Sequence, residues 1–254
     1  SANAFVRAAH RSARTPRIVQ GNAGPVRILL VICRPGGDRD VPFRSVASRL
    51  IKALDGKARE ALQLDVLRPP TFSELSAVLR EAKTKGEPYH IVHFDGHGAF
   101  FDADGRDASL FLSPPRDGAH GYLVFENPAV EQNCQYVDGP GLGKLLWETG
   151  VPVLVLNACR SAHAEPRAQP EPAATRDVHA EARAFGSLAQ EVVDLGIGGV
   201  VAMRYNVYVV TAAQFVADLY ESLANGETLG EAVTLGRKQL QANPLREIAY
   251  DRRP

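Results

Sequence analysis

A histidine and a cysteine support the most specific chemistry that this sequence offers. His97 follows an apolar run at residues 89–94 and has a glycine on each side. Cys159 follows a second apolar run, at residues 153–156. An imidazole beside a thiol takes its proton and turns it into a nucleophile. The pair therefore predicts cysteine-type hydrolysis, with His97 as general base and Cys159 as nucleophile.

This prediction requires the two apolar runs to be neighbouring strands of a parallel sheet. Reactions in such sheets take place beyond the carboxyl ends of the strands, where both residues are expected to lie. The glycines around His97 would permit a tight turn and a close approach of backbone to a ligand. The backbone N–H groups of Gly98 and Cys159 would then form an oxyanion hole, in which one donor is typically worth ~2.7–4 kcal/mol.

The rest of the sequence predicts the sheet that this arrangement needs. Apolar runs of strand length occur at residues 26–33, 62–67, 89–94, 153–156 and 199–203, with a further strand near 122–125. Helical periodicity occurs at residues 43–54, 72–82, 142–146, 185–195, 211–223 and 229–240. Alternating strands and helices predict an α/β fold with a mostly parallel sheet covered on both faces.

Local signals mark where helices begin and where regular structure is interrupted. The segments Thr71-Phe-Ser-Glu74 and Thr228-Leu-Gly-Glu231 are capping boxes that start helices. Residues 99–138 form a long polar excursion, and residues 161–184, with three prolines, are expected to be a loop. Residues 1–25 are small, polar and rich in Gly and Pro, so they predict a flexible N-terminal arm.

The composition excludes several classes of protein. The 254 residues carry 29 Lys and Arg against 29 Asp and Glu, with 45% apolar residues, which argues against disorder and against nucleic-acid binding. Three cysteines are too few for a disulfide scaffold and favour a reducing, cytoplasmic compartment. No apolar run approaches the ~18–20 residues of a membrane helix, so no membrane role is expected.

The two motifs resemble one family. Residues 93–98 read His-Phe-Asp-Gly-His-Gly and residues 156–161 read Leu-Asn-Ala-Cys-Arg-Ser, each after a strand, which is similar to the CHAT domain. CHAT domains are caspase-like cysteine peptidases, related to caspases, separase, gingipain and legumain. The resemblance extends from about Val26 to about Ala242 and includes the run at residues 198–205 and the segments at residues 215–220 and 230–232.

The resemblance implies a caspase-like three-layer α/β sandwich over residues 26–254. It implies a cysteine endopeptidase with His97 as base, Cys159 as nucleophile and the amides of Gly98 and Cys159 as oxyanion hole. It also implies a longer, multidomain bacterial protein, because the family's last strand would lie beyond residue 254. Other domains would sense a signal and release the cleavage of a partner protein, in signalling or defence.

The family pattern also indicates where specificity would arise. The residue two before the cysteine, here Asn157, helps to form the pocket for P1, the residue that precedes the cut. Relatives that cut after Arg or Lys place carboxylates in this pocket, and relatives that cut after Asp place arginines there. The candidates are Asp95, Asp38 and Asp40 for the carboxylates, and Arg44 and Arg204 for the arginines. The wider habit of the clan favours a basic P1.

Two further expectations concern peptide binding and processing. A substrate peptide would add as a strand alongside residues 203–206. Residues 161–184 occupy the place of the caspase inter-subunit linker, where self-cleavage would fall at an arginine. The candidates are Arg167, Arg176 and Arg183. The competing interpretation is an insertion without consequence, since loops tolerate added length.

A metal site competes with the peptidase interpretation. His93, Asp95 and His97 alternate and so would share one face of a strand. Further carboxylates follow at Asp102, Asp104 and Asp107. However, His93 lies within the apolar run, where a core histidine is expected, and residues 102–105 open like a calcium loop that lacks its closing glutamate. We expect no metal and no cofactor.

Phosphate binding and a non-catalytic role also compete with the peptidase interpretation. Residues 139–144 resemble a P-loop but are one residue short, follow no predicted strand and have Leu145 where Ser or Thr belongs, so they predict a helix start. The glycines at residues 196–199 precede a strand, the reverse of the dinucleotide-binding order. Because a fold does not dictate a function, a caspase-like scaffold or adaptor remains open.

Overall fold

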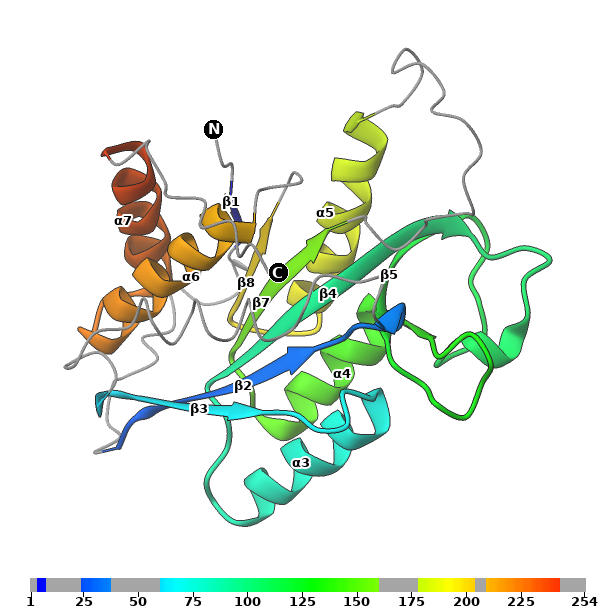
Figure 1. The fold of residues 1–254 in the computed structure, drawn as a ribbon, viewed down its shortest axis with the longest axis horizontal. Helices are drawn as coiled ribbons and strands as arrows, with labels where there is room; N and C mark the ends of the chain where they lie inside the picture. The colour runs from blue at the N-terminus through cyan, green and yellow to red at the C-terminus, as the bar shows by residue number, and fades with distance from the viewer. Residues whose placement is uncertain (1–3, 8–23, 38–59, 160–177, 204–208, 243–254) are drawn as a thin grey trace, which may run out of the picture.

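Strands and helices alternate along most of the chain and build one mixed sheet with helices on both sides (Figure 1). The computed structural model describes residues 4–7, 24–37, 60–159, 178–203 and 209–242. The strands are β1 (Ala4–Arg7), β2 (Val26–Ile32), β3 (Leu62–Val66), β4 (Ile91–Asp102), β5 (Ala119–Phe125), β6 (Gln135–Asp138), β7 (Val153–Cys159) and β8 (Gly199–Met203). The helices are α3 (Phe72–Thr84), α4 (Gly139–Thr149), α5 (Val178–Asp194), α6 (Val209–Ala224) and α7 (Leu229–Ala242).

The sheet has a parallel centre and antiparallel margins. Its order is β1-β8-β7-β4-β2-β3, and β8, β7, β4, β2 and β3 all run parallel. β1 pairs antiparallel with β8, and the distal half of β4 pairs antiparallel with β5, which in turn pairs with β6. This arrangement confirms the predicted α/β class and is consistent with the caspase-like sandwich.

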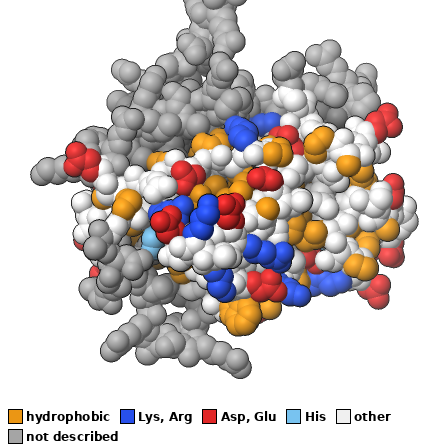
Figure 2. All heavy atoms as spheres, turned by 90° about the horizontal axis from the view of Figure 1, so that it is seen from below, with side chains coloured by type: hydrophobic (Ala, Val, Ile, Leu, Met, Phe, Trp, Pro, Cys, Tyr) orange, Lys and Arg blue, Asp and Glu red, His pale blue; other side chains and the backbone are white. Residues whose placement is uncertain are grey.

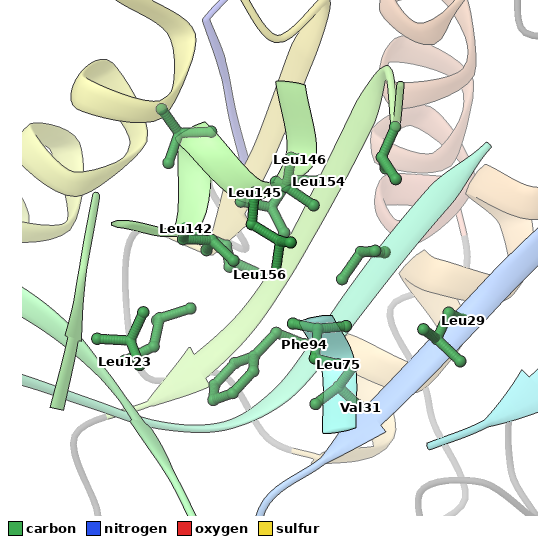
Figure 3. Packing of buried hydrophobic residues seen from close by; sticks show 14 of the residues in the cluster. Leu29, Val31, Leu75, Phe94, Leu123, Leu142, Leu145, Leu146, Leu154 and Leu156 are labelled. Carbon is green, nitrogen blue, oxygen red and sulfur yellow. The ribbon is translucent and has the colours of Figure 1, made fainter. Parts of the chain in front are cut away.

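One face of the sheet packs against α3, α4 and α5. Alternate residues of the central strands supply this core, as the period of two in a strand requires. Figure 3 labels Leu29 and Val31 of β2, Phe94 of β4, and Leu154 and Leu156 of β7 together with residues of α3, α4 and β5. The strands are buried on both faces, which explains why they are nearly continuous apolar runs in the sequence.

The other face packs against α6 and α7. Ile28 and Leu30 of β2, Ile91 of β4, and Val153 and Val155 of β7 meet Phe215, Leu219 and Tyr220 of α6 there. Because side chains alternate along a strand, His93, Asp95 and His97 lie on the same face of β4 as Ile91. His97 therefore faces the side of the sheet that α6 and α7 cover.

The predicted capping box at α7 is confirmed in full, and the one at α3 is confirmed for the bond to the threonine hydroxyl. Thr71 is the N-cap of α3, and its hydroxyl accepts a hydrogen bond from the Glu74 amide at 3.1 Å. At the start of α7 the box is reciprocal. The Glu231 amide donates to the Thr228 hydroxyl at 3.3 Å, and the Thr228 amide donates to the Glu231 carboxylate at 2.9 Å.

Several predicted boundaries were wrong. β4 was expected to end near Phe94, but it continues to Asp102 because β5 provides an antiparallel partner for its second half. No position was predicted for β6, and α5 begins at Val178, inside the segment expected to be a loop. Residues 4–7 of the predicted flexible arm form β1. The predicted helix at residues 43–54 lies outside the described residues.

The described surface has no strong bias of charge on the face drawn in Figure 2. Blue and red side chains alternate across it, with orange side chains between them. This mixture fits the equal numbers of acidic and basic residues in the chain. In the part of the chain that the structure describes, none of the helices has the length and apolar character to cross a bilayer.

Candidate active site

The register of two parallel strands brings the predicted dyad positions together. β4 and β7 are adjacent in the sheet, and their Cα partners run from Ile91↔Val153 to His97↔Cys159. Neighbouring strands lie about 4.8 Å apart, and paired positions share a face of the sheet. The requirement that the two motif-bearing strands be neighbours is therefore met. The structure describes the backbone of Cys159, while its side chain lies outside the described part.

His97 lies at the point along β4 where the neighbouring strand changes from β2 to β5. β2 pairs with β4 as far as Asp95, and β5 pairs with β4 from His97 onward. β7 ends at Cys159, the partner of His97. The parallel part of the sheet thus ends at the level of the dyad, where an open parallel sheet places its functional groups. His97 is 4% exposed, so its imidazole is largely shielded from water.

A network of buried and part-buried polar side chains lies two residues before the dyad on both strands. Asp95 is 3% exposed and is the register partner of Asn157. The Asn157 amide donates to one oxygen of the Asp95 carboxylate at 2.6 Å, and the Arg34 guanidinium forms an ion pair with the other. Sequence reasoning found Asp95 and Asn157 but missed Arg34. The only signal for it was its position directly after the β2 apolar run.

Arg34 is held by the ends of the strands around it. Its guanidinium donates to the carbonyl oxygens of Cys33 at 2.8 Å and Asp95 at 3.0 Å. Its backbone amide donates to the Glu126 carboxylate at 2.7 Å, directly after β5. The network therefore connects the ends of β2 and β5 to β4 and β7.

His93 is a core histidine, as the sequence interpretation preferred. It is 2% exposed, and a hydrogen bond of 2.7 Å joins its Nδ1 to the Tyr220 hydroxyl of α6. Burial lowers the pKa of His93 to about 4, against the opposing effect of Asp95, so the ring is neutral at pH 7. Among the described residues no three His, Cys, Asp or Glu side chains come together as a metal site would need.

Cys33 directly follows β2, but it does not lie on the same side of the sheet as His97. It lies in the core beneath α3, on the face of the sheet opposite His97, with none of its surface exposed. Its thiol donates to the Pro70 carbonyl at 3.3 Å, and burial raises the pKa of Cys33 well above its usual value. A protonated, inaccessible thiol cannot act as a nucleophile.

Comparison with known families agrees with this geometry. The model of the CHAT domain family matches residues 1–253 of the chain. The chain belongs to the CHAT domain family. This family is caspase-like, so the resemblance predicted from the two motifs is confirmed. No curated protein sequence matches the chain.

The glycine before the histidine of this CHAT domain serves packing and not a turn. Gly96 lies within β4, so the tight turn expected there is absent. A Cβ atom at Gly96 would lie 2.8 Å from the ring of Phe94 and 3.2 Å from the Cβ of Cys33. Gly98 also lies within β4, where it is the partner of Leu123 of β5. Its role in an oxyanion hole stays a prediction.

The P-loop-like segment of the CHAT domain is a closely packed helix start. It follows β6, so the expectation that no strand precedes it was wrong. The Asp138 carboxylate caps the helix by accepting from the Gly141 amide at 2.9 Å. A Cβ atom at Gly139 would lie 3.0 Å from the Leu188 carbonyl of α5. The glycine thus permits close helix packing, and a carboxylate occupies the end of the helix that a phosphate would need.

The remaining predicted specificity residues are described only in part. Asp38, Asp40, Arg44 and Arg204 lie outside the described residues, as do Arg167 and Arg176. Arg183 falls within α5, where its side chain is not described. Of the segment predicted to pair with a substrate, Met203 is described, and Ala4 of β1 is its register partner. The chain's own N-terminal strand therefore borders β8 at this point.

Proposed function

We propose that this CHAT domain is a cysteine endopeptidase that cleaves a partner protein through His97 and Cys159. The observation that carries the proposal is the register His97↔Cys159 between adjacent strands. A nucleophile and its base must lie within hydrogen-bond reach, and paired positions on one face of a sheet offer that separation.

The chemistry assigns one step to each group. Cys159 gives its proton to His97, and its sulfur attacks the scissile carbonyl to form a tetrahedral oxyanion. The N–H groups of Gly98 and Cys159 stabilise this oxyanion. His97 then protonates the leaving amine as the C–N bond breaks. Water, deprotonated by His97, hydrolyses the thioester and restores the thiol. No metal or cofactor takes part in this scheme.

Substrate choice and regulation extend the proposal. The substrate is a protein or peptide, and neither nucleic acid nor membrane is a partner. Asn157 contributes to the P1 pocket, and the clan's habit favours a basic P1. Regulatory or sensor domains of a longer cytoplasmic protein control the activity, and cleavage within residues 161–184 accompanies it. The balanced charge supports the exclusion of nucleic acid, and the small, odd number of cysteines supports a reducing compartment.

A labelling experiment separates the peptidase from a catalytically silent scaffold. The protein is incubated with a peptidyl acyloxymethyl ketone, and the modified residue is located by peptide mass mapping. We expect modification of Cys159, its loss in Cys159→Ala and His97→Ala, and its retention in the matched control Cys33→Ala. Proteolysis of a peptide library should follow the same order and survive a strong chelator. Proteolysis that persists in Cys159→Ala would refute the proposal.

A further inference from the structure

The end of β7 that bears Cys159 has few backbone supports among the described residues. β8 pairs with β7 from Val153 to Leu156 and no further. The last three residues of β7 therefore pair with β4 alone in the described part of the chain. The separation and level of Cys159 relative to His97 depend on what holds this end of β7 against β4.

A side-chain hydrogen bond lies at that end of the strand. The Asn157 amide donates to the Asp95 carboxylate at 2.6 Å, across the pair that precedes His97↔Cys159 on the same face. A hydrogen bond to a charged acceptor is stronger than one between neutral groups, and burial strengthens it further. Asp95 thus joins the two strands by side chains at the step before the dyad.

The Asp95 carboxylate has both of its oxygens engaged. One accepts from Asn157, and the other is ion-paired with Arg34, which is itself bound to Glu126 through its backbone amide. A basic P1 side chain would have to compete with both of these partners for a carboxylate that is only 3% exposed. Breaking this largely enclosed ion pair to admit another cation would be unfavourable.

We propose that Asp95 is a positioning residue that holds the Asn157 end of β7 level with His97, and that it is not the carboxylate that selects a basic P1. Arg34 supports this role by neutralising the buried charge and by tying Asp95 to the ends of β2 and β5. The inference rests on the proposed peptidase function, since it concerns the same two catalytic residues.

The two roles of Asp95 predict different kinetics in an Asp95→Asn variant. The test uses the best-cleaved library peptide and its copy with P1 exchanged between Arg and Leu. A displacement of about 1 Å costs on the order of 100-fold in rate. Positioning therefore predicts that kcat falls about 10- to 100-fold on both peptides, with little change in KM and an unchanged Arg-to-Leu preference. A loss of that preference with full kcat on the Leu peptide would overturn the proposal.

A second variant separates a lost charge pair from a lost substrate contact. In Asp95→Asn/Arg34→Gln neither partner leaves a buried charge, and the amide oxygen at 95 can still accept from Asn157. We expect this double variant to recover most of the kcat lost in Asp95→Asn. The matched control is Asp65→Asn. The Asp65 carboxylate belongs to β3, accepts a hydrogen bond from the Tyr89 hydroxyl and lies far from the dyad along the sheet. No recovery in the double variant, with all variants folded by circular dichroism, would contradict the role of Arg34.

A measurement without a peptide distinguishes failure of this inference from failure of the peptidase proposal. Cys159 is alkylated by iodoacetamide across a pH series, and the midpoint of the rate reports its pairing with His97. A paired thiol reacts with a midpoint below the ~8.5 of a free cysteine. We expect a lowered midpoint in the wild type and a rise toward the free value in Asp95→Leu, even if no peptide is cleaved. A midpoint that Asp95→Leu leaves unchanged refutes positioning, and a free-cysteine midpoint in the wild type refutes the dyad itself.

Discussion

Replacing His93 with glutamine should remove a defined part of the acid sensitivity of this fold. Burial holds the pKa of His93 at about 4, against an ordinary value of 6.5, and the ring packs against Tyr220. The unfolded chain therefore takes up a proton at a higher pH than the folded chain does. The stability that the neutral ring provides is complete above pH 6.5 and is lost as the pH falls toward 4.

The size of this effect follows from the difference between the two pKa values. Proton linkage over that interval lowers the free energy of unfolding by about 2 kcal/mol between pH 7 and pH 4.5. Urea denaturation of the wild type and His93→Gln at both pH values measures it. The variant should be less stable at pH 7, but its stability should fall by about 2 kcal/mol less on acidification.

His90 provides the matched control. It precedes β4, and its pKa is lowered by burial, but its ring is only partly buried whereas that of His93 is fully enclosed. His90→Gln should retain most of the acid sensitivity. Proton NMR of the His93 ring should show a titration midpoint near 4. Equal losses of stability in the wild type and His93→Gln, or a His93 midpoint near 6.5, would refute the reasoning.

Three further predictions concern packing, capping and thiol reactivity. Gly96→Ala should cost about 1–3 kcal/mol by overpacking against Phe94, whereas Gly186→Ala in α5, where a Cβ meets nothing within 4 Å, should cost nothing; urea midpoints compare the two. Asp138→Ala should lower stability by about 0.5–2 kcal/mol through loss of the α4 cap, and Asp138→Asn should restore most of it. In the folded protein Cys33 should resist a thiol reagent that modifies it rapidly in urea, and rapid modification without urea would contradict its burial.

The parallel strands could be predicted because they are buried on both faces. Such strands are short apolar runs bounded by Gly, Pro and charge, and β2, β7 and β8 are read from the sequence in this way. The second half of β4 could not be predicted, because the sequence Asp95-Gly96-His97-Gly98 looks like a loop. Only the presence of β5 gives this segment a partner, and that pairing is tertiary information.

In the candidate site, too, local features could be predicted from the sequence and tertiary contacts could not. The residue types of His97 and Cys159 and their positions after strands are local features, so the sequence predicts them. The polar network before the dyad is not local. An arginine after a strand usually faces solvent, whereas the Arg34 side chain is only 13% exposed and forms an ion pair with Asp95 of the adjacent strand.

The alternation of side chains along β4 decides which neighbours each motif residue has. Phe94 faces the core beneath α3 and α4, and the space above Gly96 is filled there by Phe94 and Cys33. His93, Asp95 and His97 face the other way, toward α6 and β7. A shift of β7 by one residue would place Ala158 opposite His97 in place of Cys159. The catalytic proposal therefore depends on register as much as on residue identity, and the bond between Asp95 and Asn157 is a side-chain contact, one step before the dyad, that can fix that register.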